Sequence, residues 1–60
     1  MSNFSQSELN SIREMVVCHQ TASAKLAGYS QQCQDAQIKQ MFSQASNQAQ
    51  TAAQNLLQML

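Results

Sequence analysis

The sequence predicts an all-α fold, a helical hairpin that forms a four-helix bundle as a homodimer. Two series of mostly apolar residues recur at steps of three and four, which places each series along one side of an α-helix. A short polar break separates them. The chain has only 60 residues, and a domain of that size is marginal without disulfides, a metal or oligomerisation. The first series is Leu9, Ile12, Met15/Val16, His19, Ala22, Leu26, Tyr29 and Cys33; the second is Ile38, Met41/Phe42, Ala45, Ala49, Ala52, Leu56 and Met59/Leu60.

The expected organisation is a single domain over residues 1–60, with a helix at about 6–31, a turn at about 32–35 and a helix at about 36–60. Ser5 lies three residues before Glu8, which is the spacing of a capping box at a helix start. Asp35 is a favourable N-cap for the second helix. Gly28 lies inside the first helix, where it is either a point of close helix contact or a tolerated residue that lowers helix stability.

One continuous helix of about 50 residues is the alternative to a hairpin. The step from Cys33 to Ile38 is five residues, which would turn the apolar side by about 140° if the helix continued. That change of direction, together with a capping residue inside it, favours a turn.

Each expected helix has one apolar side, so two hairpins packed face to face would make a bundle with crossing angles of about 20°. A two-fold symmetric dimer is the commonest closed arrangement. The residues expected in the core and the dimer interface are Leu9, Ile12, Val16, His19, Leu26, Tyr29, Ile38, Phe42, Ala45, Ala49, Ala52, Leu56 and Leu60.

Charge and hydropathy argue against several functional classes. Three basic and three acidic residues give a net charge of zero, whereas a nucleic-acid binder normally carries a basic patch. Neither helix has the basic polar face of a membrane-surface helix, and no apolar run approaches a transmembrane span of about 20 residues. The first residues do not look like a signal peptide. Free cysteines fit a reducing cytosol, so we expect a cytoplasmic protein. The charge and hydropathy lead us to expect no nucleic-acid partner and no membrane partner.

The residue chemistry predicts neither an enzyme nor a cofactor. Cys18 and Cys33 are fifteen residues apart in one helix, or roughly 22 Å along its axis, too far for a disulfide within the chain; whether either cysteine links two chains stays open. His19 is expected to be a core histidine, with a metal ligand or proton carrier as the alternative. Di-iron bundles need more carboxylates and Glu-x-x-His pairs than this chain offers, so no metal site is predicted, and His19 with Glu14 are the only candidates for one.

Three short motifs stand out in the sequence: Leu9-x-x-Ile12-Arg13-Glu14-Met15-Val16-Val17, Lys25-Leu26-Ala27-x-Tyr29 and Asp35-x-x-Ile38-Lys39-x-x-Phe42. In these motifs, and over most of its length, the chain resembles the small ferritin-like proteins of the spore coat F family. A Leu-rich final turn is part of the resemblance, and Asn47-Gln48 departs from it, because many members carry a histidine midway along the second helix. The resemblance implies a coat or coat-associated structural role in sporulating Gram-positive bacteria.

From these observations we expect a non-enzymatic structural protein that acts by self-association of its helical bundle. Its partners would be itself, in a homodimer or a higher assembly, and other coat proteins, with deposition in the spore coat. Two alternatives stay open. One is a ferritin-like metal-binding protein that uses His19 across a dimer, and the other is a helical-hairpin RNA-binding regulator.

Overall fold

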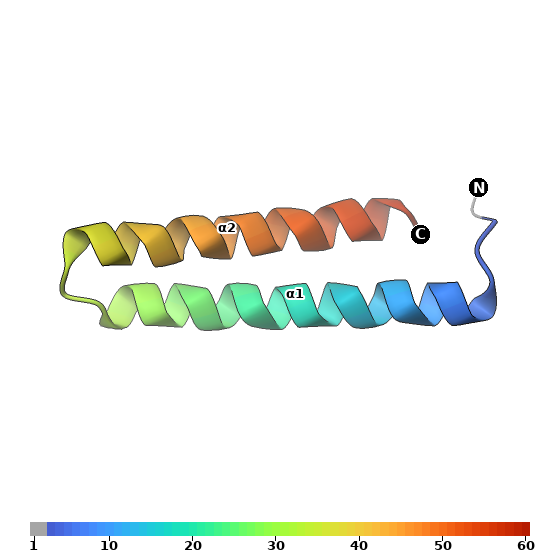
Figure 1. Ribbon diagram of the computed structural model, residues 1–60, viewed down its shortest axis with the longest axis horizontal. Coiled ribbons are helices and arrows are strands. Elements are labelled where there is room, and N and C mark those ends of the chain that lie inside the picture. Colours follow the sequence, from blue (N-terminus) through green and yellow to red (C-terminus); the bar gives the residue numbers. More distant parts are fainter. Residues whose placement is uncertain (1–2) are drawn as a thin grey trace.

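Two antiparallel helices make up the part of the protein that the structure describes. The computed structural model describes residues 3–60, in which α1 spans Gln6–Gln32 and α2 spans Ala36–Gln58, with no strand in that range. The helices lie side by side, and the end of α2 returns to the start of α1, as Figure 1 shows. The expected all-α hairpin is confirmed, and a single continuous helix is excluded. The first helix extends one residue beyond the expected range, to 32, and the second ends at 58 rather than 60.

A capping box begins α1. The Glu8 amide donates to the Ser5 hydroxyl at 3.1 Å, and the Ser5 amide donates to the Glu8 carboxylate at 2.8 Å. These bonds satisfy two amides that lack partners within the helix. The backbone and side-chain hydrogen bonds of Ser5 hold the pKa of the Glu8 carboxyl below its usual range, because they favour the ionised form.

The turn consists of three residues with capping bonds on both sides. Cys33 ends α1 in an extended conformation, and its amide donates to the carbonyls of Tyr29 and Ser30 at 3.1 and 3.3 Å. The Asp35 carboxylate accepts from the amides of Gln37 and Ile38 at 2.8 and 3.2 Å. The prediction of Asp35 as the N-cap of α2 is therefore confirmed.

A layer of buried serines joins the two helices. The Ser23 hydroxyl donates to the carbonyl of Ser46 at 2.9 Å, and the Ser46 hydroxyl donates to the carbonyl of Ser23 at 2.8 Å. Two turns closer to the loop, the Ser30 hydroxyl donates to the Lys39 carbonyl at 2.9 Å. A serine side chain is only two atoms long, so these bonds require the helix backbones to approach closely.

The serine bonds define an antiparallel register with a seven-residue repeat. Ser23 and Ser30 are seven residues apart on α1, and Ser46 and Lys39 are seven apart on α2. One repeat further along, Val16 comes opposite Ala53, and both residues are buried. A repeat of seven keeps one side of each helix toward its neighbour, as in a coiled coil.

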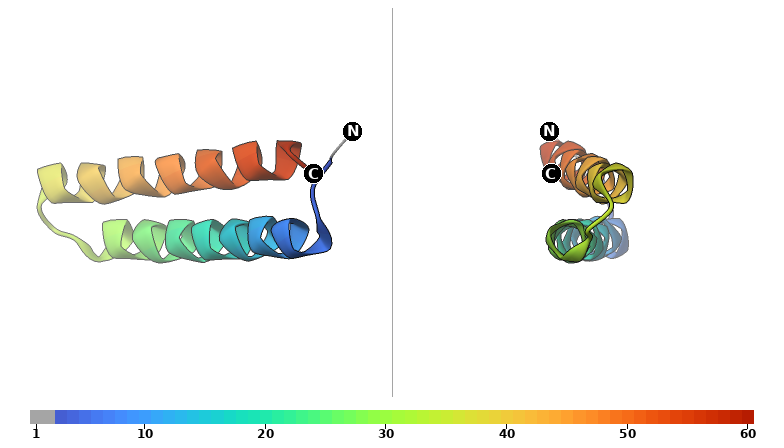
Figure 2. Two further views of the ribbon diagram at one scale, coloured as in Figure 1. Left: turned by 45° about the vertical axis from the view of Figure 1, so that its right-hand side comes forward. Right: turned by 90° about the vertical axis from the view of Figure 1, so that its left-hand side faces the viewer.

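The interior between the helices is small. Ile12, Val16 and Ala53 are the buried apolar residues among those described, and three serines are buried beside them. The Cα radius of gyration is 14.2 Å, against about 10 Å for a compact domain of this length. The end-on view in Figure 2 shows a single pair of helices, slightly inclined to each other, with no further element covering them.

Gly28 is not a point of close helix contact. A Cβ atom at this position would meet no atom within 4 Å. Of the two interpretations of Gly28, the structure supports a tolerated residue on an open part of the helix surface.

Replacement of Ser5 by alanine should lower the free energy of unfolding by about 1 kcal/mol, because the Glu8 amide loses its acceptor. Urea unfolding followed by circular dichroism, at one protein concentration for both proteins, measures the difference. Ser7→Ala is the matched control, since Ser7 lies outside the cap, and it should leave stability nearly unchanged. Equal stability of the Ser5 variant and the wild type would contradict this account of the helix start.

Ser46→Leu should destabilise the hairpin by about 1–3 kcal/mol, because the close approach of the helices leaves no room for three additional carbon atoms. Ser43→Leu is the matched control on the same helix, where the side chain is exposed. Thermal unfolding of both variants measures the difference. If the two variants melt at the same temperature, the tight serine layer is not present in solution.

Gly28→Ala should stabilise the protein by up to about 1 kcal/mol, since alanine has the higher helix propensity and the added methyl group meets open space. The same unfolding measurement tests this change. A loss of stability would place an unrecognised neighbour against Gly28.

Candidate functional site

The most prominent surface feature is a set of large apolar side chains left in the open. The exposed fractions are 48% for Met15, 47% for Tyr29, 46% for Ile38 and 47% for Met59. Scattered exposed apolar residues are ordinary on proteins, whereas a contiguous apolar patch indicates an interaction site. The question is therefore whether these residues share one face.

The repeat of seven places them on one face. On α1, Met15, Ala22 and Tyr29 follow each other at steps of seven, so they lie along one line on the helix. On α2, the corresponding line is Ile38, Ala45, Ala52 and Met59. Each line is displaced from the serine layer in the same rotational sense about its own helix axis, and since the helices are antiparallel, both lines border the same broad side of the hairpin.

A ring contact joins the two helices on this side. The rings of Tyr29 and Phe42 meet edge to face, with centroids 5.6 Å apart. Partly buried residues form the floor between the two lines, so the apolar surface continues across the helix boundary. We call this surface the apolar face; its members are Met15, Ala22, Leu26, Tyr29, Ile38, Phe42, Ala45, Ala49, Ala52, Leu56 and Met59.

The total surface shows how much area the hairpin leaves uncovered. The chain exposes 4627 Å², whereas a folded monomer of 6.6 kDa typically exposes roughly 3,900 Å². The excess of roughly 700 Å² is close to the area of about 800 Å² that one partner buries in a standard protein–protein interface.

Charged residues lie outside the apolar face along most of its length. Glu8 precedes Met15 by seven residues at one end, where its carboxylate is bonded to the cap of α1. Asp35 lies in the turn at the other end, bonded to the start of α2. The three basic residues do not form a patch, since Arg13 and Lys25 are twelve positions apart, about 18 Å along α1, and Lys39 lies on α2.

Val17 shows that not every exposed apolar residue belongs to this face. It is 60% exposed, but it lies two positions from Met15, which is a rotation of 200° around the helix. Together with Arg13, Glu14 and Cys18 it lines a shallow depression on the outer surface of α1.

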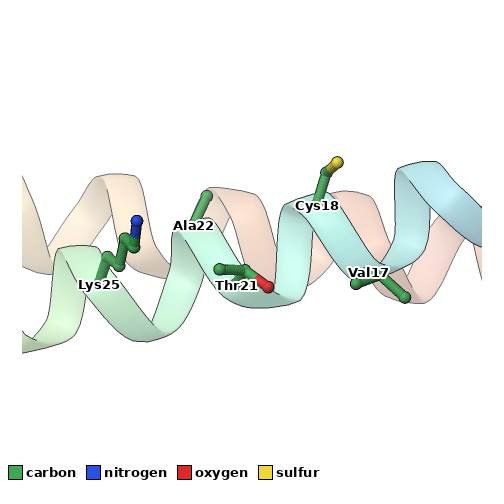
Figure 3. Close-up of a pocket in the computed structure, with 5 residues that line it drawn as sticks. All are labelled: Val17, Cys18, Thr21, Ala22 and Lys25. Atoms are coloured by element: carbon green, nitrogen blue, oxygen red, sulfur yellow. The ribbon is translucent and has the colours of Figure 1, made fainter.

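A second shallow depression lies beside the first. Figure 3 shows its lining, Val17, Cys18, Thr21, Ala22 and Lys25, all from α1, with Cys18 and Ala22 pointing to one side of the helix and Val17 to the other. Because one helix supplies every side chain, no groups converge on a ligand as they do in an enclosed site.

His19 lies on the floor of the apolar face, partly buried. Its Nδ1 atom is 2.7 Å from the carbonyl oxygen of Met15. A carbonyl oxygen only accepts hydrogen bonds, so Nδ1 carries the proton, and in the neutral ring Nε2 keeps the free lone pair.

The metal-ligand candidates do not come together within one chain. Glu14 is exposed on the outer surface of α1, five residues before His19, so the two side chains leave the helix about 140° apart. Within residues 3–60, no group of three or more histidine, cysteine, aspartate or glutamate side chains is placed to hold a metal ion. Both cysteines are free, with Cys18 exposed and Cys33 partly buried.

The structure distributes the expected core residues among three environments. Ile12 and Val16 are buried between the helices. Those partly buried at the border of the helix contact are Leu9, His19, Leu26, Phe42, Ala45, Ala49, Ala52 and Leu56. Tyr29, Ile38 and Leu60 are about half exposed in the single chain, so their expected place in a dimer interface stays a prediction.

The apolar pattern alone missed the serine layer. Ser23, Ser30 and Ser46 are buried, yet the sequence series passed through Ala22 and Tyr29 because those residues are apolar. The signal that could have found the serines is the repeat of seven, which links Leu9, Val16, Ser23 and Ser30 on one line.

Comparison with protein-family models, with curated proteins and with solved structures finds no match to this chain. Among the described residues, neither helix is long and apolar enough to cross a membrane. The spore coat F resemblance therefore stays an expectation from sequence.

Proposed function

We propose that this protein is a structural assembly module rather than an enzyme, and that two copies pair through the apolar face into a two-fold symmetric four-helix bundle. The observation that carries the proposal is the uncharged, half-exposed apolar face that both helices build together. Its uncovered area approaches what one partner contributes to a standard interface.

A second copy of the chain is a suitable partner for this face. Small residues surround the His19 ring in the middle of the face, with Ala22 on α1 and Ala45 on α2, and the end near the turn carries the large side chains Tyr29 and Ile38. Two such faces can approach closely where the side chains are small, while the larger side chains fill the space toward the ends. Four helices around a shared interior would supply the core that one hairpin lacks.

The biological role we propose is that of a small structural component, with deposition in the spore coat and contact with other coat proteins. This part of the proposal is supported by the sequence resemblance alone. The polar surface outside the apolar face, rich in glutamine, serine and asparagine, suits packing into a dense layer because it carries little charge to repel neighbouring copies.

Met15→Glu should convert the dimer into a monomer at concentrations where the wild type is dimeric, because the substitution places a charge in the middle of an apolar interface. Light scattering coupled to size exclusion measures the molar mass of each protein. Val17→Glu is the matched control, since it makes the same change two residues away at a more exposed apolar position on the opposite side of α1.

A monomeric wild type at high micromolar concentration would contradict the proposed dimer. Equal effects of the two substitutions would show that the chain does not pair through the apolar face. Localisation of a tagged chain in sporulating cells tests the coat role separately, because a protein absent from purified coats could still form the dimer.

A further inference from the structure

His19 occupies the centre of the apolar face. It is the middle residue of α1, with thirteen helix residues on either side. Met15 and Ala22 lie one turn before and one turn after it on the same side of the helix. The centre of a face is covered in every register in which two copies overlap substantially, so the place of His19 in a dimer does not depend on whether the hairpins pair parallel or antiparallel.

The segment of α2 opposite His19 contains no ionisable side chain. The serine register places the ring near Ala49, and residues 45–53 consist of alanine, serine, asparagine, glutamine and threonine only. In one hairpin these small side chains leave the ring partly open to water. A second copy on the apolar face would close that opening.

The carboxylates of α1 lie away from His19. Glu14 lines the outer surface together with Arg13. Cys18 and Lys25 line the second depression beside Ala22 (Figure 3), on the side of the helix that borders the apolar face, and Lys25 lies six residues from His19, about 9 Å along the axis. Tyr29 and Glu8 share the side of the helix that carries the face, but they are ten and eleven residues from His19, about 15 Å or more along the axis. The Nδ1 proton is already bonded to the Met15 carbonyl, so a second proton would go to Nε2.

We propose that His19 makes the dimer sensitive to pH: the neutral ring is accepted between two copies, and a proton added at Nε2 drives the copies apart. This inference rests on the proposed dimer. Two effects act in the same direction. Burial disfavours a charged ring, and two-fold pairing brings in a second copy of the same charge. Histidine is the side chain that ordinarily changes charge between pH 5 and 8.

The sign follows from proton counting. The separated chains bind more protons than the dimer does, so lowering the pH favours the separated chains. Two histidines are involved in each dimer, and we expect the dimer dissociation constant to rise by about tenfold or more between pH 8 and pH 5.5. That range lies above the ordinary titration of aspartate and glutamate, so the change is not a carboxylate effect.

Sedimentation equilibrium of the untagged chain at about pH 8 and pH 5.5, at constant ionic strength, measures the dissociation constant, and circular dichroism checks that the helices persist. His19→Gln is the comparison variant, because glutamine is polar and stays neutral over the whole range. His19→Leu is a second variant for the case that glutamine weakens pairing at both pH values. The expected result is a rise of about tenfold or more in the wild type and no rise in either variant.

Different outcomes separate the two proposals. A wild-type dimer with the same dissociation constant at both pH values would overturn the role of His19 and leave the dimer standing. An equal rise in the wild type and in both variants would assign the effect to another group and overturn the inference. A wild type that is monomeric at both pH values would overturn the dimer itself, and with it the inference.

Discussion

The reciprocal pair of hydrogen bonds between Ser23 and Ser46 is the constraint on which the rest of the structure depends. Each hydroxyl reaches the backbone carbonyl of the opposite helix, so the two helices must run close together. At the serine layer there is room only for small side chains, and one repeat further along Val16 packs opposite the small residue Ala53. Large side chains are then displaced to the border of the contact. The apolar face is therefore a consequence of the tight serine layer. The side of each helix that carries the serines faces the other helix, so the large apolar side chains beside it stay uncovered.

The serine bonds contribute more to register than to stability. A hydrogen bond within a protein adds only about 0.5–1.5 kcal/mol net, whereas a buried polar group without a partner costs about 1–3 kcal/mol. The buried side-chain oxygens and nitrogens of the described residues all have partners. A shift of α2 along α1 by seven residues would bring Ala53 opposite Ser23 and separate Ser23 from Ser46. The register is thus fixed by paired polar groups as well as by the packing of Ile12, Val16 and Ala53.

Local signals in the sequence were enough to predict the two helices and the turn. The capping residues Ser5 and Asp35 define the helix starts through short-range hydrogen bonds, which need no knowledge of the rest of the fold. The contact between the helices was harder to predict, because each helix has an apolar arc wider than one neighbour can cover. Apolarity does not say which edge of that arc faces the other helix. Here the edge marked by Ser23 does so, and the edge marked by Tyr29 stays exposed. The exposed edge would be covered by a partner, and the apolar pattern of one chain does not specify the partner's contacts.

The hairpin brings the end of α2 back beside the start of α1 (Figure 1). Two copies joined head to tail in one polypeptide would thus have both junction points at the same end of each hairpin. A short flexible linker could join them only if the hairpins lay side by side with their turns together. If the turns lay at opposite ends, the linker would have to span most of the 46 Å length of the molecule, and the effective concentration of one half near the other would fall with the added length. The shortest linker with which two joined copies still form the bundle would thus show whether the turns of the two hairpins lie at the same end or at opposite ends.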